Sequence, residues 1–183
     1  MKAVLISIRP KWCEKIFSGE KTIEVRRNRP KLEPPFTVYV YCTKAKNIRE
    51  DGLYLLPNDK ELYLGCKEKD LGFVCWEGDF RNGKVIGSFV CDKIEKIDFQ
   101  AQCTATLSER WTFNRIAKQA CLTAEQLNEY LSGDIGYGWR ITEPKLFDKP
   151  KELSEFMLGD GWIAGRFPVK RAPQSYVYVE DLT

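Results

Sequence analysis

Short apolar stretches recur along most of the chain and predict a fold built mainly from β-strands. Runs of about four to eight apolar or alternating residues are typical of strands. Eight segments show this pattern, at 3–8, 22–27, 36–42, 71–77, 84–91, 93–99, 137–141 and 176–180. The Asn82-Gly83 pair favours a type I′ turn, so we expect a hairpin that joins residues 73–76 to Val85-Ile86.

Four other segments carry helical spacing or capping signals. Residues Pro10 to Ser18 start with a proline that suits the first helical position, and Gly19 behind them suits a left-handed C-cap. Residues 123–131 start with Thr123 as N-cap and have Gln126 at the capping-box position. We also expect helices at 110–120 and 150–156. Eight strands with three to four peripheral helices predict an α+β, mainly β fold, in the form of a mixed β-barrel.

The stretch from Gly19 to Arg26 contains the densest group of candidate functional residues. Alternation places Ile23 and Val25 on one face of the strand and Thr22, Glu24 and Arg26 on the other, with Lys21 at the preceding turn. These side chains can form a compact ionic and hydrogen-bonding site. The alternative is a surface cluster of ion pairs, which contributes about 0–1 kcal/mol per pair.

Length and composition indicate one folded domain. The chain has 183 residues, of which 43% are hydrophobic and 13% aromatic, enough for a packed core. Residues 46–70 have the loop signals of an insertion. No run approaches the roughly 20 apolar residues that span a bilayer, and the N-terminus lacks a signal-peptide pattern. We therefore expect a cytoplasmic protein without a membrane partner.

The cysteines and the missing histidine restrict the chemistry. The seven cysteines are widely spaced and form no Cys-x-x-Cys pair, so we expect reduced thiols, no metal site and no cofactor. Cys42, Cys75 and Cys91 lie in apolar strands, where buried thiols act as small hydrophobic groups. Without histidine, Ser-His-Asp and Cys-His mechanisms are excluded, and catalysis would need carboxylate, lysine, tyrosine, cysteine, serine or threonine.

The positive charge is concentrated at the N-terminal end of the sequence. Residues 1–50 contain 12 Lys and Arg against 5 acidic residues, a net charge of +7, whereas residues 51–183 contain 17 against 21, a net charge of −4. Four of the basic residues, Arg26, Arg27, Arg29 and Lys31, lie within six positions. They can contact phosphates or, alternatively, protect the edge of a sheet.

The order strand, short helix, Gly-x-Lys-x-x-Glu-x-Arg and strand resembles the opening of the ASCH (activating signal cointegrator homology) domain family. The matching residues are Gly19, Lys21, Glu24 and Arg26, preceded by 6–10 and 16–18. A second resemblance, at 137–141 and 149–153, is to small, often prophage-borne ASCH proteins. The family belongs to the PUA-like superfamily of small β-barrels associated with RNA, so the resemblance implies a PUA-like mixed β-barrel that binds RNA or a nucleotide.

The resemblance also implies a binding cleft lined by Lys21, Glu24 and Arg26. Further residues that we expect to contribute to it are Ser7, Lys11, Thr22, Tyr137, Trp139 and Ser175. Trp139 and Tyr137 could stack a base, which contributes about 1–3 kcal/mol. Core packing is the alternative for Trp139, and bonding to the backbone is the alternative for the Ser7 hydroxyl.

An enzymatic role is the alternative to simple binding. One bacterial ASCH subgroup hydrolyses the acetyl amide of N4-acetylcytidine with a lysine, a threonine and a glutamate. Its lysine matches Lys21, but Glu24 occupies the position of its threonine, so the hydroxyl nucleophile is replaced by a carboxylate. Other ASCH proteins have been linked to RNA cleavage, for which Lys21 and Glu24 could serve as acid and base.

Overall fold

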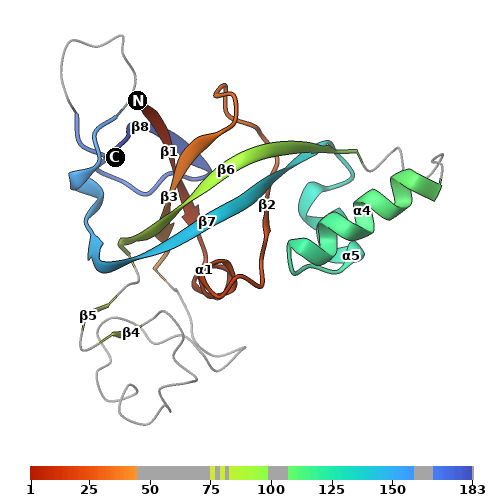
Figure 1. Cartoon of the computed structure of the whole chain (residues 1–183), viewed down its shortest axis with the longest axis horizontal. Coiled ribbons are helices and arrows are strands. Elements are labelled where there is room, and N and C mark those ends of the chain that lie inside the picture. The colour runs from red at the N-terminus through yellow and green to blue at the C-terminus, as the bar shows by residue number, and fades with distance from the viewer. Residues whose placement is uncertain (45–74, 77–78, 81–82, 99–106, 159–166, 183) are drawn as a thin grey trace. The chain divides into compact units, whose positions relative to one another are not determined.

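The computed structural model describes residues 1–44, 75–76, 79–80, 83–98, 107–158 and 167–182, and Figure 1 shows them in colour. The predicted insertion at 46–70 lies outside this part. The described elements follow the chain in this order: β1 (Lys2–Ile8), α1 (Pro10–Phe17), β2 (Ile23–Arg26), β3 (Phe36–Cys42), β4 (Cys75–Trp76), β5 (Asp79–Phe80), β6 (Val85–Ile97), α4 (Leu107–Gln119), α5 (Ala124–Leu131), β7 (Gly136–Lys151), a 3₁₀ turn (Leu153–Glu155) and β8 (Tyr176–Glu180).

Six strands form one mixed sheet, in the order β2-β7-β6-β3-β1-β8. β1 pairs in parallel with β3 and antiparallel with β8, and β2 pairs antiparallel with β7. The first and last strands of the sheet, β2 and β8, are not joined by a ladder among the described residues, so the sheet is open there. The predicted α+β, mainly β class is confirmed, whereas the closed barrel stays a prediction.

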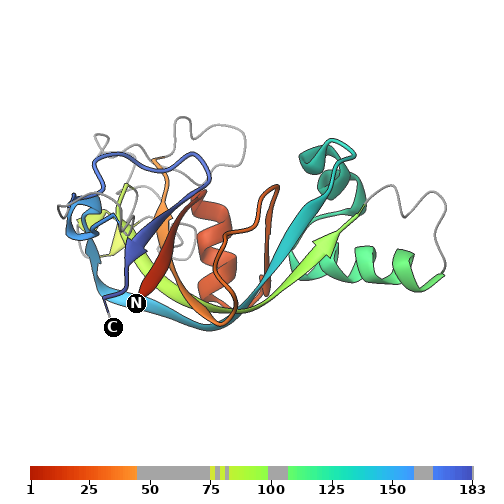
Figure 2. The ribbon, with the colours of Figure 1, turned by 90° about the horizontal axis from the view of Figure 1, so that it is seen from above.

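The chain divides into two compact units. The first contains 1–14, 37–88 and 145–183, and the second contains 15–36 and 89–144. β8 runs beside β1 in the first unit, and the helices α4 and α5 belong to the second (Figures 1 and 2). The expectation of one domain over the whole chain stays a prediction.

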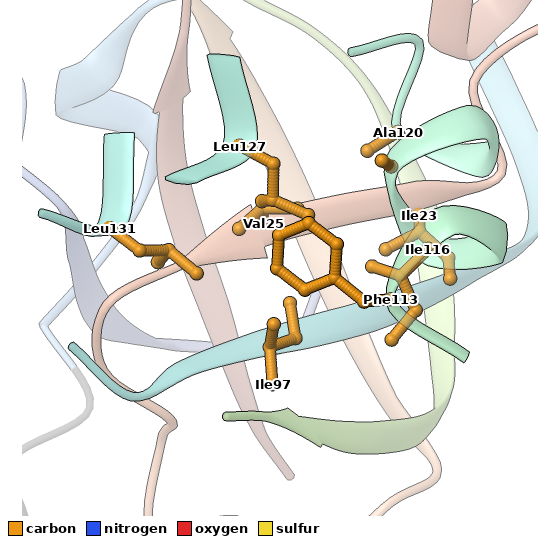
Figure 3. Packing of buried hydrophobic residues seen from close by; sticks show 9 residues of the cluster. Ile23, Val25, Ile97, Phe113, Ile116, Ala120, Leu127 and Leu131 are labelled. Carbon is orange, nitrogen blue, oxygen red and sulfur yellow. The ribbon is translucent and has the colours of Figure 1, made fainter. Parts of the chain in front are cut away.

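Each unit has its own hydrophobic core. In the first, side chains from β1, β3 and β8 enclose Phe156, whose ring meets Tyr39 at 4.9 Å between centroids. In the second, Ile23 and Val25 of β2 pack against Phe113, Ile116 and Leu127 from α4 and α5, as Figure 3 shows. The apolar face that alternation assigned to β2 is therefore the face that carries these helices.

The strands β6 and β7 differ from the sequence predictions. The predicted strands at 84–91 and 93–99 form one strand, Val85–Ile97, although Asp92 interrupts the apolar pattern. The Asp92 carboxylate accepts two hydrogen bonds from Arg140 of β7, at 2.6 and 2.5 Å, and this pairing satisfies the charge without a break in the strand.

The helix predicted at 150–156 is wrong. β7 continues to Lys151, and only Leu153–Glu155 forms a single 3₁₀ turn. Proline fixes φ near −65°, which suits both the first turn of a helix and a sheet position that needs no N–H donor, so the local signal was ambiguous. Pro144 and Pro150 lie beyond residues 137–140, where β7 pairs with β2.

The hairpin at Asn82-Gly83 has different partners from those predicted. β4 pairs with β5, with Cys75 opposite Phe80, rather than with Val85. Gly83 does have a left-handed φ of 82°, and its N–H donates to the carbonyl of Cys42 at 2.7 Å. Asn82 lies outside the described residues. The glycine is therefore needed for a turn, but the strand beside it is β3.

Candidate functional site

The position of Lys21 is fixed by the end of α1. Gly19 has a φ of 80°, as a left-handed C-cap requires, and the Lys21 N–H donates to the carbonyl of Lys15 at 2.7 Å. The chain then extends into β2, where the Thr22 N–H donates to the carbonyl of Gln119 at 2.9 Å. The predicted cap at Gly19 is thus confirmed, and it turns the chain toward the end of α4.

Lys21, Glu24 and Arg26 form one ionic cluster. The Lys21 Nζ lies 3.4 Å from Oε2 of Glu24, and the Arg26 Nε lies 3.0 Å from Oε1 of the same carboxylate. Only 4% of the Lys21 side chain, 10% of Glu24 and 8% of Arg26 are exposed. The sequence pattern predicted this grouping correctly. The alternative, a cluster of ion pairs on the surface, does not describe it, because all three side chains are buried.

Lys21 also contacts the last turn of α4. Its ammonium donates a hydrogen bond of 2.9 Å to the carbonyl oxygen of Ala120. Carbonyls at the end of a helix lack partners within the helix and carry the negative end of its dipole, so a lysine there stabilises the helix. Lys21 therefore has a structural role in addition to any role in binding.

The pairing of β2 with β7 adds two predicted site residues to the same face. Glu24 lies opposite Trp139, and Arg26 lies opposite Tyr137. Directly opposed residues of an antiparallel pair share a face, so Tyr137 and Trp139 lie on the side of the ionic cluster. The small residue between them, Gly138, lies opposite Val25, and a Cβ at Gly138 would be 3.1 Å from Ile23.

The two aromatic residues have different exposures. Trp139 is completely buried and meets Phe36 edge-to-face, with ring centroids 6.0 Å apart. This burial matches the alternative of a core residue, and no face of the indole is open to stack a base in this structure. Tyr137 is half-buried, so the phenol is the better placed of the two to contact a ligand.

The remaining predicted residues take other positions. Thr22 is half-buried next to the cluster, and its carbonyl accepts the Ile141 N–H at 2.9 Å. Ser7, Lys11 and Ser175 belong to the other compact unit. The Ser7 hydroxyl donates to the carbonyl of Pro173 at 2.7 Å, as the backbone-bonded alternative describes. The Lys11 ammonium lies 4.9 Å from the ring centre of Trp12.

Sequence reasoning missed the contribution of the α4–α5 junction. The Ala120 carbonyl binds Lys21, and Cys121 beside it has a φ of 58°, with its thiol 3.5 Å from the carbonyl of Glu20. Burial raises the pKa of this thiol, which keeps it protonated. The junction carries no glycine, so no local signal indicated a left-handed residue here.

Four cysteines have described side chains, and none of them forms a disulfide: Cys13, Cys42, Cys91 and Cys121. Cys13, Cys42 and Cys91 are buried and Cys121 is half-buried. The predicted burial of Cys42 and Cys91 is confirmed, whereas Cys75 lies outside the residues whose side chains are described. In the part of the chain that the structure describes, no three His, Cys, Asp or Glu side chains are grouped as a metal site would need. None of the helices there has the length and apolar character to cross a bilayer.

Comparison with known proteins agrees with this fold. The chain forms a small α+β fold with a mixed sheet, in which Lys21 precedes β2 and Glu24 and Arg26 lie within it. The family model of the ASCH domain matches residues 6–132, more than half of the chain, and the protein belongs to the ASCH family. The match contains the Lys21 cluster and ends before the block at 137–141.

Solved structures support the same fold. The chain is similar to the crystal structure of ASCH from Zymomonas mobilis, with a TM-score of 0.57, 18% sequence identity, and coverage of 97% of this chain and 87% of that chain. Two mutant forms of that protein give TM-scores of 0.58 and 0.57 at 17% and 18% identity, covering 98% and 97% of this chain and 91% and 88% of theirs. No curated protein matches the chain. At this identity the likeness establishes the fold alone.

Proposed function

We propose that this protein binds RNA or a nucleotide through the cluster of Lys21, Glu24 and Arg26. The observation that carries the proposal is the burial of three charged residues of the family motif in one continuous set of ion pairs. Charges are costly to bury, so a paired and hydrogen-bonded cluster of this kind is a candidate for function. Membership of the ASCH family supports a nucleic-acid-binding or related function.

The charges of the cluster favour an anionic ligand group. Two of its three members are cations, and their charge matches a phosphate or a polarised carbonyl oxygen. Within the cluster, the Glu24 carboxylate fixes the positions of the Lys21 ammonium and the Arg26 guanidinium. The net charge of +7 in residues 1–50 acts in the same direction, because it attracts polyanions at long range.

The proposal is tested by titrating a fluorescently labelled single-stranded oligoribonucleotide with the wild-type protein and with Lys21→Ala and Lys2→Ala. Each variant loses one positive charge, but Lys2 is an exposed residue at the start of β1. A lost contact to a charged group costs about 1.5–3 kcal/mol, or roughly tenfold or more in affinity. We expect that loss for Lys21→Ala at about 150 mM salt and little change for Lys2→Ala, since the charge of an exposed residue is screened there.

Because Lys21 also bonds to Ala120, a second variant separates binding from folding. Arg26→Lys keeps the charge but loses the planar guanidinium, which can contact a phosphate at two points. We expect weaker RNA binding from a variant that still folds, which a thermal melting curve establishes before the titration, since Arg26 is buried beside Glu24. Equal affinity of the wild type, Lys21→Ala and Arg26→Lys, all folded, would contradict the proposal. Repeating the titration at two salt concentrations counts the phosphates contacted, with a slope of about −0.7 per phosphate for a single strand.

A second candidate function is hydrolysis of RNA or of a modified nucleoside. The distance of 3.4 Å between the Lys21 ammonium and the Glu24 carboxylate, both buried, favours it, because such a pair can exchange a proton during a reaction. The test is to incubate the protein with labelled RNA and with N4-acetylcytidine and to follow strand cleavage and acetate release. We expect Glu24→Gln to abolish turnover while RNA binding persists. Absence of turnover of either substrate by the wild type would contradict this second candidate.

A further inference from the structure

A pocket of about 560 Å³ opens in the first compact unit, away from the residues of the ionic cluster in sequence. It is lined by Leu158, Val169, Lys170, Arg171, Pro173, Gln174, Ser175, Tyr176 and Val177. Small-molecule sites are typically about 300–1,000 Å³, largely apolar and equipped with a few polar groups. Of the residues predicted from the sequence for the binding site, the lining contains only Ser175.

The walls of the pocket are held by hydrogen bonds to neighbouring strands. The Ser7 hydroxyl donates to the Pro173 carbonyl at 2.7 Å, and the Ser7 N–H donates to the Ser175 carbonyl at 3.4 Å. Elsewhere in the lining, the Val169 N–H donates to the Phe156 carbonyl at 2.8 Å, and Leu158 forms a bridge to Val179 of β8. A pocket fixed in this way loses little conformational freedom when a ligand binds.

The lining combines three kinds of chemistry. Leu158, Val169, Pro173 and Val177 contribute apolar surface, and the half-buried Tyr176 contributes an aromatic ring. Gln174 and Ser175 contribute groups that can hydrogen-bond to the edge of a base. Lys170 and Arg171 are both exposed at this wall, and the described lining contains no carboxylate. A flat, partly apolar ligand with an attached anionic group would match the apolar, the hydrogen-bonding and the cationic parts of this lining.

We propose that this pocket holds one nucleotide of a bound RNA strand, with the base against Tyr176 and the apolar lining and the phosphate at Lys170 and Arg171. The proposal rests on the proposed RNA-binding function and adds a second contact to it, built from a different part of the chain. In this arrangement Ser7 is a positioning residue, because its bonds to residues 173 and 175 hold one wall of the pocket.

The double variant Lys170→Gln/Arg171→Gln tests the phosphate contact, and Lys2→Gln/Lys145→Gln is the control, since it removes two exposed positive charges from the same unit. Affinity for a labelled oligouridylate is measured by fluorescence anisotropy at about 150 mM salt, with Lys21→Ala in parallel. We expect roughly tenfold weaker binding or more for the pocket variant and less than about twofold change for the control. Both replace exposed residues, so the melting temperatures are expected to match that of the wild type.

A second readout locates the base directly. Cross-linking of an oligoribonucleotide that carries 4-thiouridine, followed by mass spectrometry, is expected to label the peptide that contains Tyr176, and Tyr176→Leu should lose that label. If Lys21→Ala weakens binding while the pocket double variant binds normally and Tyr176 is not labelled, the pocket proposal is overturned and the proposed function stands. If the wild type binds neither the oligouridylate nor uridine monophosphate, both proposals are overturned.

Discussion

At the scale of single residues, Lys21 shows how one side chain serves two purposes. Its ammonium completes the end of α4 through Ala120 and also pairs with Glu24. The sequence indicated the second contact, because Lys21 and Glu24 are three residues apart. It could not indicate the first, since Ala120 is 99 positions away in sequence and contributes only a backbone carbonyl.

Gly19 offers a test of the turn that positions Lys21. Its φ is 80°, and a Cβ there would meet no heavy atom within 4 Å, so Gly19→Ala introduces backbone strain without a steric clash. An alanine in the left-handed region costs about 1–2 kcal/mol. We expect the free energy of unfolding, measured by urea titration, to fall by that amount. Asparagine tolerates this conformation better, so Gly19→Asn should lose less; an equal loss for both variants would contradict strain as the cause.

At the scale of secondary-structure elements, the sequence predicted correctly those elements whose conformation depends on neighbouring residues in the chain. α5 begins after Thr123 with a complete capping box, in which Thr123 and Gln126 each bond to the backbone of the other, as predicted. The strands β3 (Phe36–Cys42) and β8 (Tyr176–Glu180) have the predicted bounds. The predictions failed at β6 and β7, where pairing between neighbouring strands overrides the polar and proline interruptions.

The capping box predicts the effect of one substitution. Thr123→Ala removes the acceptor of the Gln126 N–H, which lies 3.2 Å from the hydroxyl oxygen. Loss of an N-cap hydroxyl costs about 1 kcal/mol. We expect a decrease of this size in the free energy of unfolding by urea titration, and Thr123→Ser should restore most of it. If serine is no better than alanine at this position, the hydroxyl is not the stabilising group.

The ion pair between β6 and β7 predicts a dependence of stability on acid pH. Hydrogen bonds from Arg140 hold the pKa of Asp92 below its ordinary value of 3.8. A carboxyl group whose pKa is lowered by folding stabilises the fold fully above the unfolded-state pKa, and this contribution is lost as the pH falls through the lowered pKa. The melting temperature of the wild type should therefore decrease as the pH is lowered below about 4.

The variant Asp92→Asn isolates this contribution. It cannot titrate, so we expect its melting temperature to vary less with pH below about pH 4 than that of the wild type, with the two proteins differing most near neutral pH. Arg140→Gln should produce the same flattening, because it removes the partner that lowers the pKa. Parallel pH profiles for the wild type and both variants would exclude a stabilising role for the pair.

At the scale of the whole molecule, strand pairing joins segments that are distant in sequence. β1 pairs with β3 and with β8 near the other end of the chain, and β2 pairs with β7. The order of the strands in the sheet was therefore not accessible from hydrophobic patterns, which describe one segment at a time. The class of the fold was accessible, since it depends on the number and type of the segments.

The cysteines give a prediction that covers the whole chain. We expect the denatured protein to react with seven equivalents of a thiol reagent and metal analysis to find no stoichiometric zinc. In the native protein labelling should be slower, because Cys13, Cys42 and Cys91 are buried and burial raises the pKa of Cys91 to about 12. Mass spectrometry after labelling counts the thiols. Fewer than seven reactive thiols on unfolding, or near-equimolar zinc, would show this interpretation to be wrong.

The sequence alone determined the class of the fold, the turn at Gly19 and the grouping of Lys21, Glu24 and Arg26, because spacing along one turn and one strand decides which side chains share a face. The tertiary structure decided that this group is buried, because β7 lies against β2 and the Ala120 carbonyl receives the lysine. It also decided that Trp139 is a core residue and that Ser7 donates hydrogen bonds to the carbonyls of Pro173 and Ser175 in the lining of the pocket. These outcomes depend on contacts between residues about 100 or more positions apart, for which the local pattern carries no signal.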